Sequence, residues 1–242
     1  QAQLALRHAD DAILAAREAR LSGHVSVGMA PSTASVLGVP FINAMRESYP
    51  DVRLHLVESL SGNLERMINT RQLDLAIVFQ QEKILRWSAR PVLEERLFLI
   101  GTHALLAPLQ EDHISPDQLT SLPLIMPSQG HGLRGRLEAV CQQHHLSVEV
   151  VADIDGLALL MQAVRSGLGA TLQPGAAISH LDHQALRVID VVNPILSRPN
   201  FLVSLSDDEL TPAGLAARVI LSKVMRQLVE SDRWPGATLY AH

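Results

Sequence analysis

The sequence predicts an α/β protein built from two similar lobes joined by two crossover strands. Strands and helices alternate over residues 25–79, at the spacing of a parallel sheet covered by helices. The same order of strand, turn, helix, strand, helix and strand returns over residues 122–174. A long strand at 85–102 and another at 198–205 are placed to connect the lobes. Two such lobes leave a cleft between them, where ligands of α/β proteins bind.

Composition supports this class and excludes others. The 242 residues suffice for one or two domains, and 47% of them are apolar, too many for a disordered chain. The net charge of −5, without a basic run, argues against DNA binding by this chain itself. A single cysteine, Cys141, excludes an internal disulfide framework. No apolar run approaches the roughly 18 residues of a membrane span, and no signal peptide is apparent, so we expect a soluble, cytoplasmic protein.

The first lobe is expected to follow an Ala-rich helical pattern at residues 1–21. Its apolar stripe suits either a partner helix or packing on its own domain, two alternatives that stay open. Strands are then predicted at 25–29, 52–57 and 75–79, and helices at 33–48 and from residue 58 onward.

The second lobe is predicted to begin after a crossing at Gly101–Thr102. Its expected strands are 122–126, 148–154, 170–172 and 185–192, and its expected helices are 133–144 and a helix starting at Asp155–Gly156. Thr211–Pro212 is a strong start signal for a last helix at 213–231, and residues 234–242 are expected to be an exposed tail.

Hydroxyl and amide side chains recur where predicted strands end. They are Ser32, Thr33 and Ser35 after the first strand, Ser59 and Ser61 after the second, and Ser128 and Gln129 at the start of the second lobe, with Arg134 in the helix beyond. Each hydroxyl has a simple interpretation as a helix cap. However, capping does not explain why such groups recur at strand ends that should converge, whereas a small anion at helix starts would.

No motif for metal binding, phosphate binding or nucleophilic catalysis is present. Surface exposure is the simpler interpretation of the histidine pairs His144–His145 and His180 with His183. Asp153 and Asp155 do not define acid–base geometry by themselves, and Asp155 fits a helix cap. We therefore expect no enzyme activity, no cofactor and no metal site.

Four segments together resemble a known family. They are LSGHVSVGMAPSTAS from Leu21, YPDVRLHLVES from Tyr49, LERMINTRQLDLAIV from Leu64 and SGLGATLQP from Ser166. In this order they are similar to the effector-binding region of LysR-type transcriptional regulators, over essentially all of residues 1–231. The first segment and the last helix look most like the nitrogen assimilation control subgroup.

This resemblance implies two Rossmann-like lobes of the type 2 periplasmic-binding-protein architecture. Residues 1–22 would end the linker helix that dimerises, residues 23–101 and 204–242 would form regulatory lobe I, and residues 102–203 would form lobe II. A winged helix-turn-helix domain that binds DNA would precede this chain. By position, the implied effector contacts are Ser32, Thr33, Ser61, Phe79, Pro127, Ser128, Gln129 and Gln173.

The predicted function is therefore effector sensing and oligomerisation in a DNA-binding transcription regulator. The implied partners are a small polar or anionic effector, further copies of the chain in a dimer or tetramer, and promoter DNA through the N-terminal domain only, with no membrane partner. Some family members respond to partners or to abundance instead. A solute-binding protein of a transporter and an enzyme with a cleft on a similar scaffold are the alternatives, because a fold alone does not fix a function.

Overall fold

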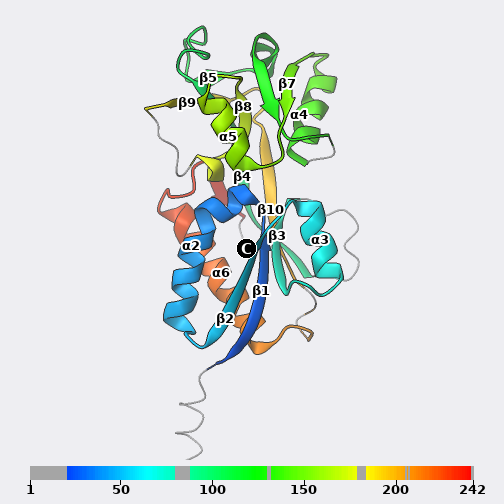
Figure 1. The fold of residues 1–242 in the computed structure, drawn as a ribbon, viewed down its shortest axis with the longest axis vertical. Helices are drawn as coiled ribbons and strands as arrows, with labels where there is room; N and C mark the ends of the chain where they lie inside the picture. Colours follow the sequence, from blue (N-terminus) through cyan, green and yellow to red (C-terminus); the bar gives the residue numbers. More distant parts are fainter. Residues whose placement is uncertain are drawn as a thin grey trace, which may run out of the picture.

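The computed structural model describes residues 21–79, 88–129, 132–178, 184–204, 206 and 208–240. These residues form two α/β lobes stacked end to end, with strands β4 and β10 running near the junction (Figure 1). The helix predicted for residues 1–21 lies outside the described residues except for Leu21, as do His180 and His183. None of the described helices has the length and apolar character needed to cross a membrane.

Lobe I contains a sheet in the order β2-β1-β3-β10-β4. Its first three strands are parallel, and β10 runs antiparallel to both β3 and β4. The strand bounds are β1 Gly23–Met29, β2 Val52–Glu58, β3 Leu75–Val78, β4 Ser88–Thr102 and β10 Ser197–Ser204.

Helices cover both faces of this sheet. Helices α2 (Pro31–Ser48) and α6 (Pro212–Glu230) pack on one face, and α3 (Ser61–Asn69) packs on the other (Figure 1). Strand β1 alternates accordingly, with Val25, Val27 and Met29 in the core beneath α2 and α6. Gly28 faces α3 so closely that a Cβ atom there would lie 2.6 Å from side-chain atoms of Leu64 and Leu73.

Lobe II repeats the first strand arrangement. Strands β6 and β7 are parallel, and backbone bonds from Ile125 N to Ala170 O (2.7 Å) and from Ala170 N to Pro123 O (2.8 Å) place the segment before β8 on the other side of β6. This order matches β2-β1-β3, and the predicted structural duplication is confirmed. The remaining bounds are β5 His113–Ile114, β6 Pro123–Met126, α4 Gly132–Gln143, β7 Glu149–Asp153, α5 Leu157–Arg165, β8 Thr171–Pro174 and β9 Leu186–Val191, with short 3-10 turns η1 Pro116–Ser121 and η2 Gly175–Ala177.

Strand β4 is shared by the two lobes. Its residues up to Arg96 pair with β10, whereas its residues from Leu97 onward pair with β8 and β9. The change of partner therefore lies at Arg96–Leu97 and not at the predicted Gly101–Thr102. This junction could not be located from the sequence, because the strand continues through it without a turn residue.

The predicted exposed tail is wrong for residues 234–240. Trp234 is 2% exposed and belongs to the core of lobe I. Strand β11 (Ala237–Leu239) then pairs antiparallel with β4, and the Tyr240 hydroxyl donates to Glu94 Oε2 at 2.7 Å. Burial and this hydrogen bond raise the pKa of Tyr240 to about 12. A single tryptophan after a helix is too weak a sequence signal to predict that the C-terminal segment packs on lobe I.

The helix caps considered at the starts of α2, α3 and α5 are not formed. The residues that precede α2, α3 and α5 are Ala30, Leu60 and Gly156, and no side chain caps these helices. Thr211 does cap α6 as predicted, since its hydroxyl accepts a hydrogen bond from Gly214 N at 3.1 Å. The serine and threonine side chains at the starts of α2 and α3 are therefore available for other contacts.

Candidate functional site

The two lobes meet at a cleft that encloses about 440 Å³ of space, part of it open to solvent. The segments after β1, β2 and β3 form one side, and the segments after β6 and β7 face them, with side chains of β8 and β10 between. The lining residues are Ala30, Pro31, Ser32, Leu60, Ser61, Phe79, Pro127, Leu133, Asp155, Leu157, Leu160, Gln173 and Arg198. Parallel strands bring their carboxyl ends to one edge of a sheet, so two facing lobes direct both edges at one space.

Five of the eight residues expected at the site line this cleft. They are Ser32, Ser61, Phe79, Pro127 and Gln173. The other three, Thr33, Ser128 and Gln129, do not line it.

Each of these three residues is directed elsewhere. Thr33 is fully buried, and its hydroxyl has no hydrogen-bond partner in the described part of the chain. The Ser128 amide and hydroxyl both donate to Asp155 Oδ1, at 2.9 and 2.8 Å, and Gln129 is exposed outside the cleft. Asp155 thus lines the cleft while it is held by Ser128, and it does not cap α5 as the sequence suggested.

The helix starts give the cleft a partly positive character. The first residues of α2 and α3 lie on its wall, and the unpaired N–H groups of a helix start carry the positive end of the helix dipole. The Ser61 hydroxyl is buried at the start of α3 and has no hydrogen-bond partner among the described residues. A buried hydroxyl without a partner costs about 1–3 kcal/mol, so this position favours a polar ligand atom.

The polar centre of the site is a buried ion pair between Glu95 of β4 and Arg198 of β10. These residues lie directly opposite each other in the strand pairing. Glu95 is 0% exposed and Arg198 is 4% exposed. The guanidinium donates to Glu95 Oε2 from Nε at 2.9 Å, and its Nη2 lies at the same distance from that oxygen. Burial lowers the pKa of Arg198, and the charge of Glu95 offsets part of this effect.

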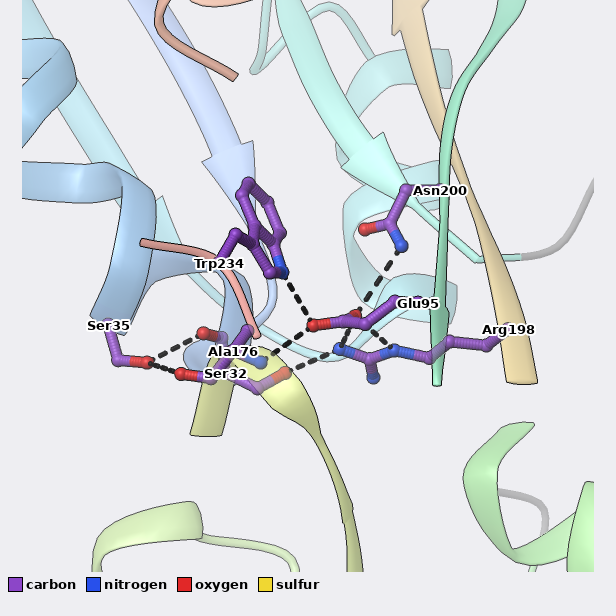
Figure 2. Close-up of polar contacts among 7 residues, drawn as sticks. All are labelled: Ser32, Ser35, Glu95, Ala176, Arg198, Asn200 and Trp234. Atoms are coloured by element: carbon purple, nitrogen blue, oxygen red, sulfur yellow. Dashed lines mark hydrogen bonds and ion pairs between the residues drawn. The ribbon is translucent and has the colours of Figure 1, made fainter. Parts of the chain in front are cut away.

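Neighbouring residues complete the network around this pair (Figure 2). Glu95 Oε1 accepts hydrogen bonds from Ala176 N and from Trp234 Nε1, both at 2.8 Å. Arg198 Nη2 also donates to the Ser32 hydroxyl at 2.8 Å, and the guanidinium carbon lies 3.6 Å from the centre of the Phe79 ring. The network thus connects the cleft wall to the first turn of α2, to lobe II through Ala176 and to the C-terminal segment.

Arg198 also has a nitrogen left for a ligand. Arg198 lines the cleft, and its Nη1 forms no hydrogen bond with any residue that the structure describes. A guanidinium whose Nε and Nη2 are fixed by Glu95 and Ser32 presents its remaining N–H groups in one orientation. Such a group suits a carboxylate or another oxyanion.

Arg198, Glu95 and Trp234 are site residues that were not predicted from the sequence. A signal was present, because Glu95 lies in phase with Leu93 and Leu97 in an alternating strand, at a position that should be buried. Arg198 and Asn200 similarly share the buried face of β10 with Leu202. Charged and polar residues at such positions indicate a buried network, although their pairing across a sequence separation of 103 residues is not visible from the chain alone.

The described residues contain no cluster of three histidine, cysteine, aspartate or glutamate side chains that would hold a metal ion. The two carboxylates considered as a pair have different partners. Arg134 Nη1 donates to Asp153 at 3.2 Å, whereas Asp155 accepts from Ser128. Asp153 and Asp155 are therefore held by separate partners and are not paired with each other.

Fold and cleft together define a two-lobed effector-binding domain, and the comparisons with known proteins identify its family. The model of the LysR substrate binding domain matches residues 18–226, so the chain belongs to this family of effector-binding domains of transcriptional regulators. The nitrogen assimilation regulatory protein nac of Escherichia coli (strain K12) is 29% identical over 244 residues, covering 97% of this chain and 74% of that protein. The nac protein of Klebsiella aerogenes is 28% identical over 235 residues, covering 95% of this chain and 76% of that protein.

Solved structures confirm the fold class. The regulatory domain of CcmR from Synechocystis PCC6803, in complex with 2-PG, has a TM-score of 0.76 at 17% identity, covering 86% of this chain and 99% of that one. The effector-binding domain of QuiR, in complex with shikimate, has a TM-score of 0.73 at 16% identity with the same coverage. The predicted resemblance to LysR-type regulators is confirmed, and the relatives are transcription regulators and not enzymes. The alternative of a transporter's solute-binding protein gains no support.

Proposed function

We propose that the cleft binds a small organic acid and that this binding sets the activity of a transcription regulator. The observation that carries the proposal is Arg198, which is buried at the cleft wall with Nη1 unused by any described residue. The starts of α2 and α3 lie on the same wall and favour negative charge.

The rest of the lining limits the ligand. Leu60, Phe79, Leu133, Leu157 and Leu160 supply apolar surface, and Asp155 places one negative charge at the lobe II side. A ligand with one anionic group, a compact apolar body and a hydroxyl or amine near Asp155 would fit this distribution. The solved relatives with shikimate and with 2-PG support a ligand of small size.

We further infer the roles of the remaining chain from its family. Residues 1–22 would end a dimerising linker helix, self-association would give a dimer or tetramer, and promoter contact would come from a preceding N-terminal domain in the cytoplasm. Closure of the two lobes on a ligand would change how attached DNA-binding domains are spaced, because binding energy shifts the population of lobe orientations.

The proposal is tested by a calorimetric screen of small carboxylic acids against the matching neutral amides. We expect at least one acid to bind while its amide does not. Ser61→Ala and Gln173→Ala should each weaken that acid about tenfold, as expected for loss of a hydrogen bond to a charged ligand. Gln129→Ala is the matched control for Gln173→Ala, because Gln129 is exposed outside the cleft, and it should change the affinity less.

Two results would contradict the proposal. Equal binding of acid and amide would remove the anionic group from recognition. Unchanged affinity in both cleft variants would place the ligand elsewhere on the molecule.

A further inference from the structure

A second groove lies on lobe I, between α6 and the strands β4, β10 and β11. It encloses about 1070 Å³ of space, part of it open to solvent. Its lining residues are Arg90, Val92, Leu202, Arg218, Val219, Ser222, Lys223, Met225, Arg226 and Leu239, and none of them lines the cleft between the lobes.

Among the lining residues that the structure describes, the four charged ones are all cationic. Arg218, Lys223 and Arg226 lie along α6, and Arg90 lies on β4. Among the described residues, Arg226 has one distant partner, Glu230 at 3.9 Å, and neither Arg90 nor Lys223 forms an ion pair. Acidic residues outnumber basic ones in the whole chain, 25 to 20, so this local excess of positive charge opposes the overall balance.

The floor of the groove is apolar. Val92 and Leu239 are partly buried, whereas Leu202 and Met225 are 3% and 1% exposed at its base. Val219, with 63% exposure, presents a branched apolar side chain at the rim. Leu202 and Met225 at this base also belong to the lobe I core, whereas Arg218, Val219, Lys223 and Arg226 lie on the part of α6 outside that core.

We propose that this groove is a second binding site, for an amphipathic carboxylate with an alkyl body. The carboxylate would lie between Arg90 and Lys223, and the alkyl chain would lie on the apolar floor. From Arg218 to Arg226 the helix advances about 12 Å, which is the length of a small molecule. A stable protein interface buries roughly 800 Å² on each partner and would have to extend well beyond this groove. The phosphates of a nucleic acid strand would pair with the cationic side chains, but the apolar floor would then have no binding partner.

The test is calorimetry of the purified chain with n-alkyl carboxylates from butyrate to decanoate, below micelle-forming concentrations, and with 1-octanol. We expect affinity to rise about fourfold per added methylene group, the gain expected for apolar burial. Octanoate should bind at least tenfold more tightly than 1-octanol, which shares the chain length and lacks the charge.

Two double variants locate the site. Arg90→Glu with Lys223→Glu should weaken octanoate at least tenfold. Arg46→Glu with Arg53→Glu changes the net charge by the same amount at exposed positions away from the groove, and it should leave the affinity unchanged. Circular dichroism spectra and melting temperatures verify that both variants are folded.

Several outcomes would overturn the proposal. These are no binding of any carboxylate in the series, equal binding of octanoate and 1-octanol, or equal weakening by the two double variants. Loss of octanoate binding in Ser61→Ala but not in the Arg90 and Lys223 variant would assign the ligand to the cleft, and binding of an acidic peptide or of DNA alone would assign the groove to a macromolecule.

Discussion

Glu95 shows at the residue scale how one buried carboxylate can organise a site. Both of its oxygens accept hydrogen bonds, from lobe II, from the C-terminal segment and from the cleft arginine. An isolated charge at this depth would be costly, and the pairing of Glu95 with Arg198 offsets part of that cost. The position of Arg198 at the cleft therefore depends on a residue that does not line it.

We predict that Glu95→Gln lowers the free energy of unfolding by about 3–5 kcal/mol, because it leaves Arg198 buried without a counter-charge. The double variant Glu95→Gln with Arg198→Met should lose less than the sum of the two single variants, since no unpaired charge remains. Urea unfolding of the four proteins measures this. Additive losses would show that the two groups do not interact energetically.

At the element scale, the C-terminal segment behaves as part of lobe I. Trp234 closes the core beneath α2, and β11 extends the sheet beside β4. The turn after β8 approaches this segment so closely that a Cβ atom on Gly175 would lie 1.5 Å from the Pro235 carbonyl oxygen. Contact between a lobe II strand end and the C-terminal segment thus requires glycine.

We predict that Gly175→Ala displaces the C-terminal segment and lowers stability by about 1–3 kcal/mol, the usual cost of overpacking. Thermal and urea unfolding measure the loss, and a red shift of tryptophan emission would report exposure of Trp234. Gly135→Ala in α4 is the control, because its Cβ would meet no atom within 4 Å and alanine favours a helix. Equal effects of the two substitutions would contradict a close contact at Gly175.

These elements also show what the sequence could and could not predict. Alternation and apolar runs located the strands that begin each lobe, because a buried sheet requires them. Strand ends pointed to Ser32 and Ser61 at the cleft, whereas Pro127 and Gln173 were implied only by the resemblance to the family. Local signals failed where the partner is distant along the chain. The Glu95–Arg198 pair and the docking of Trp234 depend on contacts across 103 and 139 residues. The bond from Arg198 to the Ser32 hydroxyl spans 166 residues and was likewise not predicted.

At the scale of the whole molecule, the lobes are joined by more than a pair of linkers. Strand β4 runs without interruption from one sheet into the other. Ala176, which follows β8 of lobe II, is buried in the core of lobe I, and its carbonyl oxygen accepts a hydrogen bond from the Ser35 hydroxyl of α2 at 2.9 Å. The proposed ligand would therefore act on a junction that is already packed, and any lobe movement would have to rearrange this contact and the Glu95 network.

This packing predicts that the two lobes unfold together. In a Trp87→Phe background, Trp234 becomes the only tryptophan and reports on lobe I, whereas far-ultraviolet circular dichroism reports on both lobes. We expect urea transitions from the two probes to coincide, as in a two-state reaction. Leu137 lies in the core of lobe II, and Leu137→Ala should lower the free energy of unfolding by about 2–5 kcal/mol. If the lobes unfold together, this substitution should shift the midpoints of the Trp234 fluorescence curve and the dichroism curve by the same amount. If Leu137→Ala shifts the dichroism curve while Trp234 fluorescence stays at its original midpoint, the lobes unfold independently and the shared strand does not couple them.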